Sequence, residues 1–354
     1  MLKSKLTHYP LKFIRPAGTS RGIMLVKNSW IIALQDKNLE GFGEFSIIET
    51  LSPDWSLEYP KILKQIIQRI NAGELIESLI QEYSHYPSIV FGLETALLDL
   101  QNGGKRELFN TNFFSGKQRI PINGLIWMND AGTMLESIKE KLDLGFNCIK
   151  LKIGAIDFPR ELELLQFIRK TFDSNTIEIR VDANGAFSFD RALEVLRDLA
   201  QLEIHSIEQP IRQGQIQEMA KLCSATPTPI ALDEELIGIH EYSDKKQLLE
   251  QIRPQYIILK PSLHGGLKGS KEWIELAEEL HIGWWITSAL ESNIGLNAIA
   301  QFASTFNTKM YQGLGTGSLY HNNISSPLTV EKGHIFYDQD KEWIIPSNVS
   351  LEFS

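Results

Sequence analysis

The sequence has little cysteine and no long apolar run, and each scarcity excludes a class of protein. Its only cysteines are Cys148 and Cys223. Their spacing matches no metal-ligand motif, and a disulfide framework requires more cysteines, so we expect two reduced thiols in the core. No stretch approaches the roughly 20 apolar residues that cross a bilayer. Because the first residues also lack an apolar signal core, the expected location is the cytoplasm, with no membrane partner.

The chain also lacks the basic tail or Lys/Arg stripe of a nucleic-acid-binding protein. Its formal net charge is -9 at pH 7, so nucleic acid is not an expected partner. The chain has 354 residues, 43% of them hydrophobic. That length can bury a large core and predicts one large domain with a smaller one.

The first part of the chain is predicted to form an α+β domain over residues 1–115. Apolar runs at 23–26 and 30–34 are typical of strands, and Gly41 and Gly43 are expected to mark the end of these strands. Helices are predicted over 59–84 and 88–103, the second with a broad apolar face. Strands followed by helices indicate an α+β fold. The tail, 324–354, has strand character at 334–337 and 343–345 and is expected to return to this domain.

From about residue 119 the pattern changes to strands that alternate with helices. Helices are predicted at 160–172, 189–200, 267–281 and 292–306. Eight strands with helical crossovers fit a closed parallel barrel over 116–323, although a doubly wound open sheet has the same alternation. The predicted strands are 120–126, 148–153, 177–181, 204–208, 229–232, 256–259, 283–287 and 309–312.

Charged residues lie at the ends of five successive predicted strands. From the second to the sixth strand, these are Lys152, Asp182, Glu208, Asp233 and Lys260, each 25 to 30 residues after the one before. That interval is one strand–helix unit, so a barrel would bring all five to one mouth, where barrel active sites lie. A strand-terminal acid by itself is more often a helix cap, and a lone lysine is more often a solvated charge.

The types of these residues predict a specific chemistry. Three converging carboxylates repel one another unless a cation joins them, and oxygen ligands of this kind suit Mg²⁺, with Mn²⁺ as a substitute. A cation and a second lysine would lower the pKa of a nearby lysine, which could then act as a general base. Lys150 shares the strand parity of Lys152 and should face the same side. The predicted reaction is proton abstraction next to the carboxylate of a small-molecule substrate.

These residues resemble the enolase superfamily over nearly the whole chain. The pair Lys150 and Lys152, the acids in VDAN, IEQP and ALDE, and the LKP at Lys260 are similar to the pattern of its muconate-lactonizing subgroup. The resemblance implies a modified (β/α)7β barrel with an α+β capping domain, completed by 324–354. It also implies Asp182, Glu208 and Asp233 as Mg²⁺ ligands and the lysines as catalytic residues. Gln209 departs from the family pattern, in which Glu-Glu-Pro is common.

The ends of the last two barrel strands bear on the choice among related reactions. Dipeptide epimerases generally have an Asp-x-Asp at the end of strand eight, whereas this chain has the acid-free segment Gly313, Leu314, Gly315. Its backbone N–H groups favour an anion, although a flexible turn is an equal alternative. It is not a dinucleotide fingerprint, because residue 318 is Ser and no helix clearly follows.

Two further segments resemble o-succinylbenzoate synthases. Ser288 lies in a stretch similar to their SxES-type segment, and the loop 18–22, with Arg21, resembles their mobile capping loop. The resemblance implies Mg²⁺-dependent dehydration in menaquinone synthesis, with Lys152 as the base. It also implies that Ser288, Gly313, Leu314, Gly315 and Arg21 contact the substrate. A dipeptide epimerase or N-acylamino-acid racemase remains the alternative, followed by a non-catalytic metabolite-binding barrel, and a homo-oligomer stays open.

Overall fold

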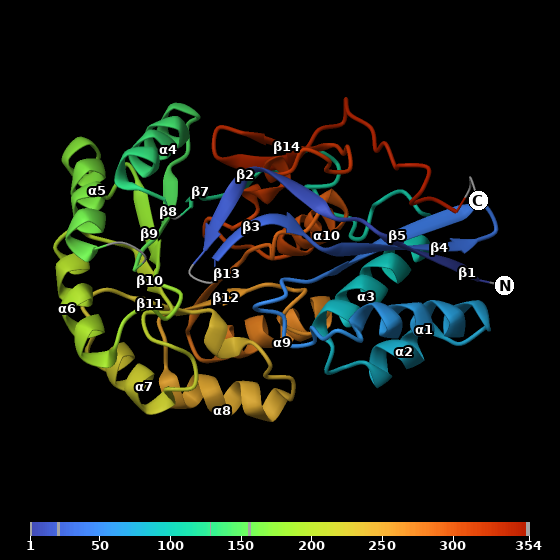
Figure 1. Ribbon diagram of the computed structural model, residues 1–354, viewed down its shortest axis with the longest axis horizontal. Coiled ribbons are helices and arrows are strands. Elements are labelled where there is room, and N and C mark those ends of the chain that lie inside the picture. Colours follow the sequence, from blue (N-terminus) through green and yellow to red (C-terminus); the bar gives the residue numbers. More distant parts are fainter. Residues whose placement is uncertain (1, 20–21, 128, 155–156, 352–354) are drawn as a thin grey trace.

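The computed structural model describes residues 2–19, 22–127, 129–154 and 157–351. Its largest element is a curled, seven-stranded parallel sheet with helices arranged around its outside (Figure 1). The strands are β7 (Gly124–Ile126), β8 (Cys148–Lys152), β9 (Glu178–Asp182), β10 (Ser206–Glu208), β11 (Ile230–Leu232), β12 (Tyr256–Leu259) and β13 (Gly283–Ile286). The helices are α4 (Ala131–Asp143), α5 (Phe158–Thr171), α6 (Phe189–Ala200), α7 (Ile216–Ala225), α8 (Tyr242–Ile252), α9 (Gly266–Glu279) and α10 (Asn293–Ala303).

The sheet closes into a barrel, as predicted. Neighbouring strands follow one another in sequence and are parallel, whereas a doubly wound sheet would change direction in its strand order. Gln312 forms a parallel bridge with Ile122, and Gly313 forms one with Thr287. The segment at 312–313 therefore joins both edges of the sheet. The predicted eighth strand at 309–312 was wrong in its extent, because only these isolated bridges form there.

Helix α6 shows why the spacing of apolar residues in the sequence predicted a helix here. The hydroxyl of Ser188 accepts a hydrogen bond from the backbone N–H of Arg191 and caps the first turn. Ala192, Val195 and Leu199 recur at helical spacing and are fully buried against the barrel. The predicted range of this helix is confirmed.

The antiparallel part of the molecule packs helices on a three-stranded sheet. Its sheet contains β1 (Lys3–His8), β4 (Ser29–Asp36) and β5 (Leu39–Ser46), and its helices are α1 (Tyr59–Asn71), α2 (Ile76–Glu82) and α3 (Pro87–Gln101). Gly41 and Gly43 let α3 lie directly on β5, since a Cβ at either position would come within 2.5 Å of the helix backbone. The single helix predicted over 59–84 was wrong. The chain breaks at Gly73, whose φ of +97° ends the helix.

The tail contacts both parts of the molecule. Strand β15 (His334–Tyr337) was predicted, and it pairs with β14 (Leu328–Glu331) and with β6 (Ile120–Pro121) just before the barrel. Farther along, Lys5 Nζ donates to the carbonyl of Ser350 at 2.8 Å, which ties the tail to the first sheet. The strand predicted at 343–345 was wrong, because only an isolated bridge forms there.

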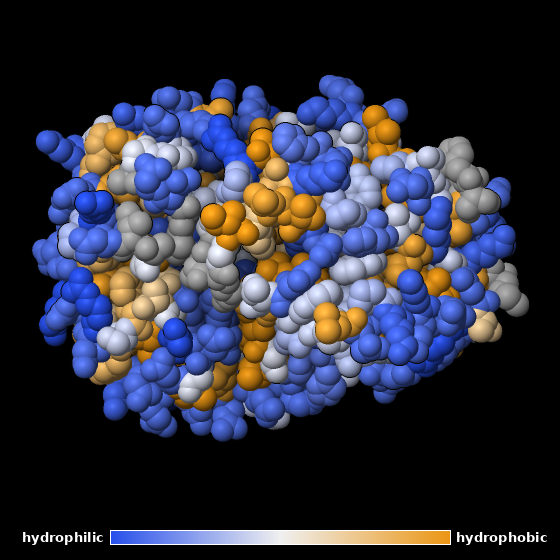
Figure 2. All heavy atoms as spheres, in the orientation of Figure 1, coloured by the Kyte–Doolittle hydropathy of each residue, from blue (hydrophilic) through white to orange (hydrophobic). Residues whose placement is uncertain are grey.

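A two-stranded hairpin, β2 (Leu11–Thr19) with β3 (Gly22–Lys27), lies near the barrel mouth (Figure 1). Figure 2 shows apolar atoms near the middle of this face, over the hairpin. Ile23 and Leu25 of β3 are exposed, whereas Met24 lines the cavity described below.

Cys148 and Cys223 are buried free thiols, as predicted. No helix within the described ranges has both the length and the apolarity to cross a membrane.

Candidate active site

The barrel register brings the predicted charged residues together at the carboxyl ends of the strands. Asp182 on β9 is in register with Lys152 on β8 and with Glu208 on β10. Asp233 directly follows β11, and Lys260 directly follows β12. All three carboxylates are buried, with exposures of 2% or less. Lys150 is two residues before Lys152, so its side chain leaves β8 on the same face.

Ion pairs connect the lysines of β8 to two of the acids. Lys150 Nζ contacts Glu208 Oε2 and lies 3.0 Å from Asp182 Oδ2. Lys152 Nζ lies 2.5 Å from Asp182 Oδ2 and also donates to Asn184 Oδ1 at 2.9 Å. Each ammonium group thus has two oxygen partners, which holds both side chains in the mouth.

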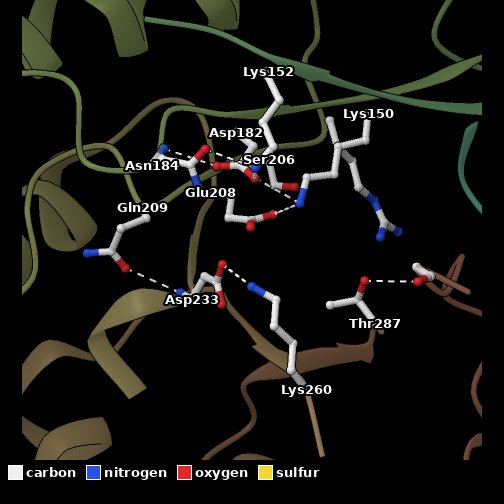
Figure 3. Close-up of polar contacts among 12 residues, drawn as sticks. Lys150, Lys152, Asp182, Asn184, Ser206, Glu208, Gln209, Asp233, Lys260 and Thr287 are labelled. Atoms are coloured by element: carbon white, nitrogen blue, oxygen red, sulfur yellow. Dashed lines mark hydrogen bonds and ion pairs between the residues drawn. The ribbon is translucent and has the colours of Figure 1, made fainter. Parts of the chain in front are cut away.

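Lys260 pairs with the third acid from the other side of the site. Its Nζ contacts Asp233 Oδ2, and Figure 3 shows Lys152 and Lys260 approaching the carboxylates from opposite sides. The backbone N–H of Lys260 donates to His264 Nδ1 at 2.8 Å. Burial lowers the pKa of His264 to about 3, so the ring is neutral and can accept this bond.

The carboxylates and lysines shift one another's pKa values. Burial would lower the pKa of Lys150, but the charges of Asp182 and Glu208 outweigh it and raise the pKa. The pKa of Lys260 is raised in the same way, mainly by Asp233. We expected lower lysine pKa values beside a cation, and the carboxylate partners described here act in the opposite direction.

Among the three acids, Glu208 has the pKa that is raised most clearly by its buried, negatively charged surroundings. Burial and the neighbouring Asp182 raise its pKa well above the usual range. Burial also opposes ionisation of Asp182 and Asp233, but Lys150 and Lys152 hold the pKa of Asp182 low, and Lys260 does the same for Asp233. The site is therefore a compact group of coupled charges, in which one carboxylate carries most of the repulsion.

The donor set at this mouth fits a divalent cation. Oε1 of Glu208 and Oδ1 of Asp233 are buried and have no hydrogen-bond partner in the described part of the chain. Buried acceptors of this kind call for an ion or water, and carboxylate oxygens suit Mg²⁺. As the side chains stand, no three ligand side chains among the described residues are arranged to hold a metal. Since Lys150 and Lys260 contact the same carboxylates, a cation would compete with them.

A cavity of about 150 Å³ lies over these charges. Its lining includes all three predicted lysines, and also Ser288, Gly313 and Gly315 at the ends of the last strands. The hydroxyls of Ser288 and Thr316 form a hydrogen bond of 2.6 Å, which fixes one wall.

Two of the predicted substrate contacts are placed differently. Leu314 is fully buried in the core and is not among the cavity-lining residues, so its contact with the substrate stays a prediction. Arg21 lies outside the described residues. The loop after Gly313 also differs from our expectation, because a short 3₁₀ helix, η2 (Gly315–Leu319), forms there.

Several residues of the site were not predicted from the sequence. Asn184 lies between Lys152 and Glu234, donating to Glu234 Oε1 at 3.0 Å, and its φ of +44° is rare for a residue other than glycine. Its place in the VDAN segment, two residues after Asp182, was the available signal. Trp285 and Met24 also line the cavity, but nothing in their spacing marks them as different from core residues.

Comparisons with known proteins agree with this architecture. Residues 133–340 match the family described as enolase C-terminal domain-like. The chain is 48% identical to an o-succinylbenzoate synthase of Desulfotalea psychrophila, over 91% of this chain and 95% of that protein. It also superimposes on the crystal structure of MenC from Desulfotalea psychrophila with a TM-score of 0.84 and 43% identity, covering 95% of this chain and 99% of that one.

A more distant neighbour shows the shared fold alone. A dipeptide epimerase of Enterococcus faecalis, complexed with Mg and a dipeptide, superimposes with a TM-score of 0.80 at 18% identity, covering 95% of this chain and 96% of that one. The predicted capped-barrel fold and the resemblance on which it was based are therefore confirmed. The chain belongs to the enolase superfamily and, within it, to the o-succinylbenzoate synthase family of lyases.

Proposed function

We propose that this protein dehydrates a cyclohexadiene carboxylate, which bears a hydroxyl and a succinyl side chain, to o-succinylbenzoate in menaquinone biosynthesis. The observation that carries the proposal is the pair of lysines, Lys152 and Lys260, on opposite sides of three strand-end carboxylates beneath a cavity. The similarity to the Desulfotalea psychrophila enzyme supports the same reaction.

Asp182, Glu208 and Asp233 would hold the divalent cation, which we propose to be Mg²⁺, with Mn²⁺ as a substitute. When bound, the cation supplies positive charge against the negative charge that develops on the substrate carboxylate. The unsatisfied oxygens of Glu208 and Asp233 support this assignment, as does the Mg in the structurally similar epimerase. Lys150, which pairs with Asp182 and Glu208, would keep these carboxylates in position.

Lys152 would act first as a base and then as an acid. Its Nζ takes the proton from the carbon next to the substrate carboxylate, and the resulting ammonium group returns that proton to the leaving hydroxyl. The hydroxyl departs as water from the same face, and the ring becomes aromatic. Lys260 would contribute positive charge from the opposite face, because one base is enough for this elimination.

The distal carboxylate of the succinyl chain would lie toward the end of the barrel's last strands. Ser288, Gly313 and Gly315 line the cavity there and present a hydroxyl and backbone groups without an acid. Leu314 would contribute its backbone, and Arg21 would be a further substrate contact. We further propose that residues 1–115 and 324–354 form the capping domain and 116–323 the barrel. The sheet of β1, β4 and β5 is separate from the barrel sheet, which supports this division, whereas the tail strands β14 and β15 pair with β6 at the start of the barrel range.

The opposed lysines would also suit epimerisation, in which one base acts on each face of the substrate. An epimerase for dipeptides needs an acid to bind the substrate's ammonium group, and residues 313–318 contain none. The deciding experiment assays purified protein with Mg²⁺ for dehydration and, in parallel, for epimerisation of a dipeptide panel and racemisation of N-acylamino acids. We expect dehydration to be the most efficient reaction. A higher kcat/KM for epimerisation or racemisation would contradict the proposal.

A further inference from the structure

The residue that departs from the family pattern, Gln209, lies at the centre of the three carboxylate-bearing strand ends. It is fully buried, directly follows Glu208, and has a φ of +39°. Its backbone N–H donates to the carbonyl of Ala231 at 2.9 Å, and its carbonyl accepts from the N–H of Gly185 at 2.7 Å. The main chain of Gln209 is therefore bonded to the segments that follow Asp182 and precede Asp233.

The side chain of Gln209 extends this connection to Asp233 (Figure 3). Its Oε1 accepts from the backbone N–H of Asp233 at 3.3 Å and from that of Glu235 at 3.2 Å. Its Nε2 donates to the carbonyl of Ile211 at 3.0 Å and to Glu235 Oε2 at 3.1 Å. Two backbone donors face the amide oxygen, and two acceptors face the amide nitrogen. These partners determine which side of the amide group carries the oxygen and which carries the nitrogen.

These contacts require an amide rather than a carboxylate at position 209. A glutamate there could still accept from the two backbone N–H groups, but it could donate nothing to Ile211 or Glu235. Two carboxylates would then face each other in a buried space, which is unfavourable. The other oxygen of Glu235 accepts from the N–H of Gly214 at 2.8 Å, so Glu235 cannot turn away without losing a bond.

We infer that Gln209 and Glu235 form a matched pair that positions Asp233, and that Gln209 is a positioning residue for the cation site. The inference rests on the proposed function, because it takes Asp233 as a ligand. The polarity of the pair could be reversed by exchanging the two side chains. The amide nitrogen at position 235 would then donate to the carboxylate at position 209, and the amide oxygen at position 235 would accept from Gly214. Only the bond to the Ile211 carbonyl would be lost.

The test is a swap of the two side chains, with Mg²⁺ binding measured by the metal-dependent rise of the unfolding temperature. Gln209→Glu alone should weaken Mg²⁺ binding roughly 10- to 100-fold, as is usual when a group that orients a metal ligand is lost. The double variant Gln209→Glu/Glu235→Gln should recover most of that loss. Gln213→Glu adds the same charge at an exposed position of the same loop and should bind Mg²⁺ as wild type does.

Two results would overturn the inference. One is a Gln209→Glu variant that binds Mg²⁺ as tightly as wild type. The other is a double variant that binds no better than the single one, since a matched pair must show coupling between its members. If Gln209→Glu fails to fold, recovery of folding by the double variant supports the pair, and failure of both contradicts it. Wild-type protein that shows no Mg²⁺-dependent shift would contradict the proposed function instead, and the pair would then be judged from unfolding temperatures alone.

Discussion

Carboxylates are buried in several parts of this molecule, and two of these parts differ in how the carboxylates are hydrogen-bonded. Glu44, on β5, is fully buried between the first sheet and the barrel. Its Oε1 accepts from the Ser29 hydroxyl and from the N–H of Ser292 at 2.9 Å, and its Oε2 accepts from the Ser292 hydroxyl at 2.5 Å and the N–H of Gly295 at 3.0 Å. The acceptor positions of both carboxylate oxygens are therefore filled by hydrogen bonds from the protein itself.

The carboxylates at the barrel mouth are just as buried but are not saturated. Glu208 and Asp233 each receive a lysine on one oxygen, while the other oxygen has no partner within the described residues. A buried acceptor without a donor is costly, so it indicates a place for a ligand. Burial does not distinguish Glu44 from Glu208 and Asp233, whereas the unused oxygens of the latter two do. Glu291, which is close to Glu44, also has one buried oxygen without a partner among the described residues, but it does not line the cavity, as Glu208 and Asp233 do. This difference predicts a structural role for Glu44 and a ligand-binding role for the carboxylates at the mouth.

The largest expected effect comes from removing the base at the mouth. Lys152→Arg should lower the dehydration rate by about 10²- to 10⁴-fold, because arginine stays protonated and cannot take the proton. Lys260→Arg should keep partial activity, since the positive charge remains. Dehydration rates and deuterium incorporation next to the carboxylate would be measured for both variants. Wild-type dehydration by Lys152→Arg would refute the assignment of the base.

Neutralising a single acid should have different consequences at the mouth and at Glu44. At limiting Mg²⁺, Asp182→Asn, Glu208→Gln and Asp233→Asn should each weaken Mg²⁺ binding and lower turnover by on the order of 100-fold or more. Glu44→Gln should leave Mg²⁺ binding unchanged but lower the free energy of unfolding by about 1–3 kcal/mol, because an amide nitrogen would face a donor. Calorimetric Mg²⁺ titration and denaturant unfolding separate the two outcomes. Near-wild-type turnover in all three mouth variants would remove the distinction.

A smaller effect should follow from adding charge to the acid-free wall of the cavity. Gly315→Asp should raise the KM for a substrate with a distal carboxylate through like-charge repulsion. A Cβ at this position would come 3.3 Å from the tip of the Ile122 side chain, which can move. Gly315→Asn controls for size without charge. Equal KM values for the two variants would place the distal carboxylate elsewhere.

The smallest effect concerns an acid outside both regions, the half-buried Glu94 of α3, which accepts from the N–H of Leu267 at 2.6 Å. Burial raises its pKa to about 7, above the roughly 4.3 of an unfolded chain. The stability that this group contributes is therefore complete below about pH 4 and lost as the pH rises through about 7. Glu94→Gln should flatten this part of the pH dependence, as measured by unfolding temperatures between about pH 5 and 8. An unchanged pH profile would contradict the shifted pKa.

The sequence predicted the strand ends well because the barrel repeats one unit. Lys152, Asp182 and Glu208 each come one strand–helix unit after the last, so register alone brings them together. The helix over 189–200 was equally clear, since a Ser cap precedes a regular apolar stripe. Local signals of this kind depend only on neighbouring residues.

Contacts between distant segments could not be predicted in this way. Nothing in the sequence shows that Glu44 binds the N-terminal turn of α10, or that Gln209 reaches the backbone of Asp233. Leu314 was expected at the substrate, but its side chain turns into the core while its glycine neighbours line the cavity. The direction of a side chain in an irregular segment is decided by tertiary packing, which periodicity does not record.

We propose that the carboxylates at the mouth, two of which have an unsatisfied oxygen, hold a divalent cation on which dehydration depends. The most direct test measures dehydration of the proposed substrate by wild-type protein after treatment with EDTA, and again after Mg²⁺ is restored. We expect activity to disappear with EDTA and to return with Mg²⁺. Dehydration at the full rate in metal-free protein would contradict it.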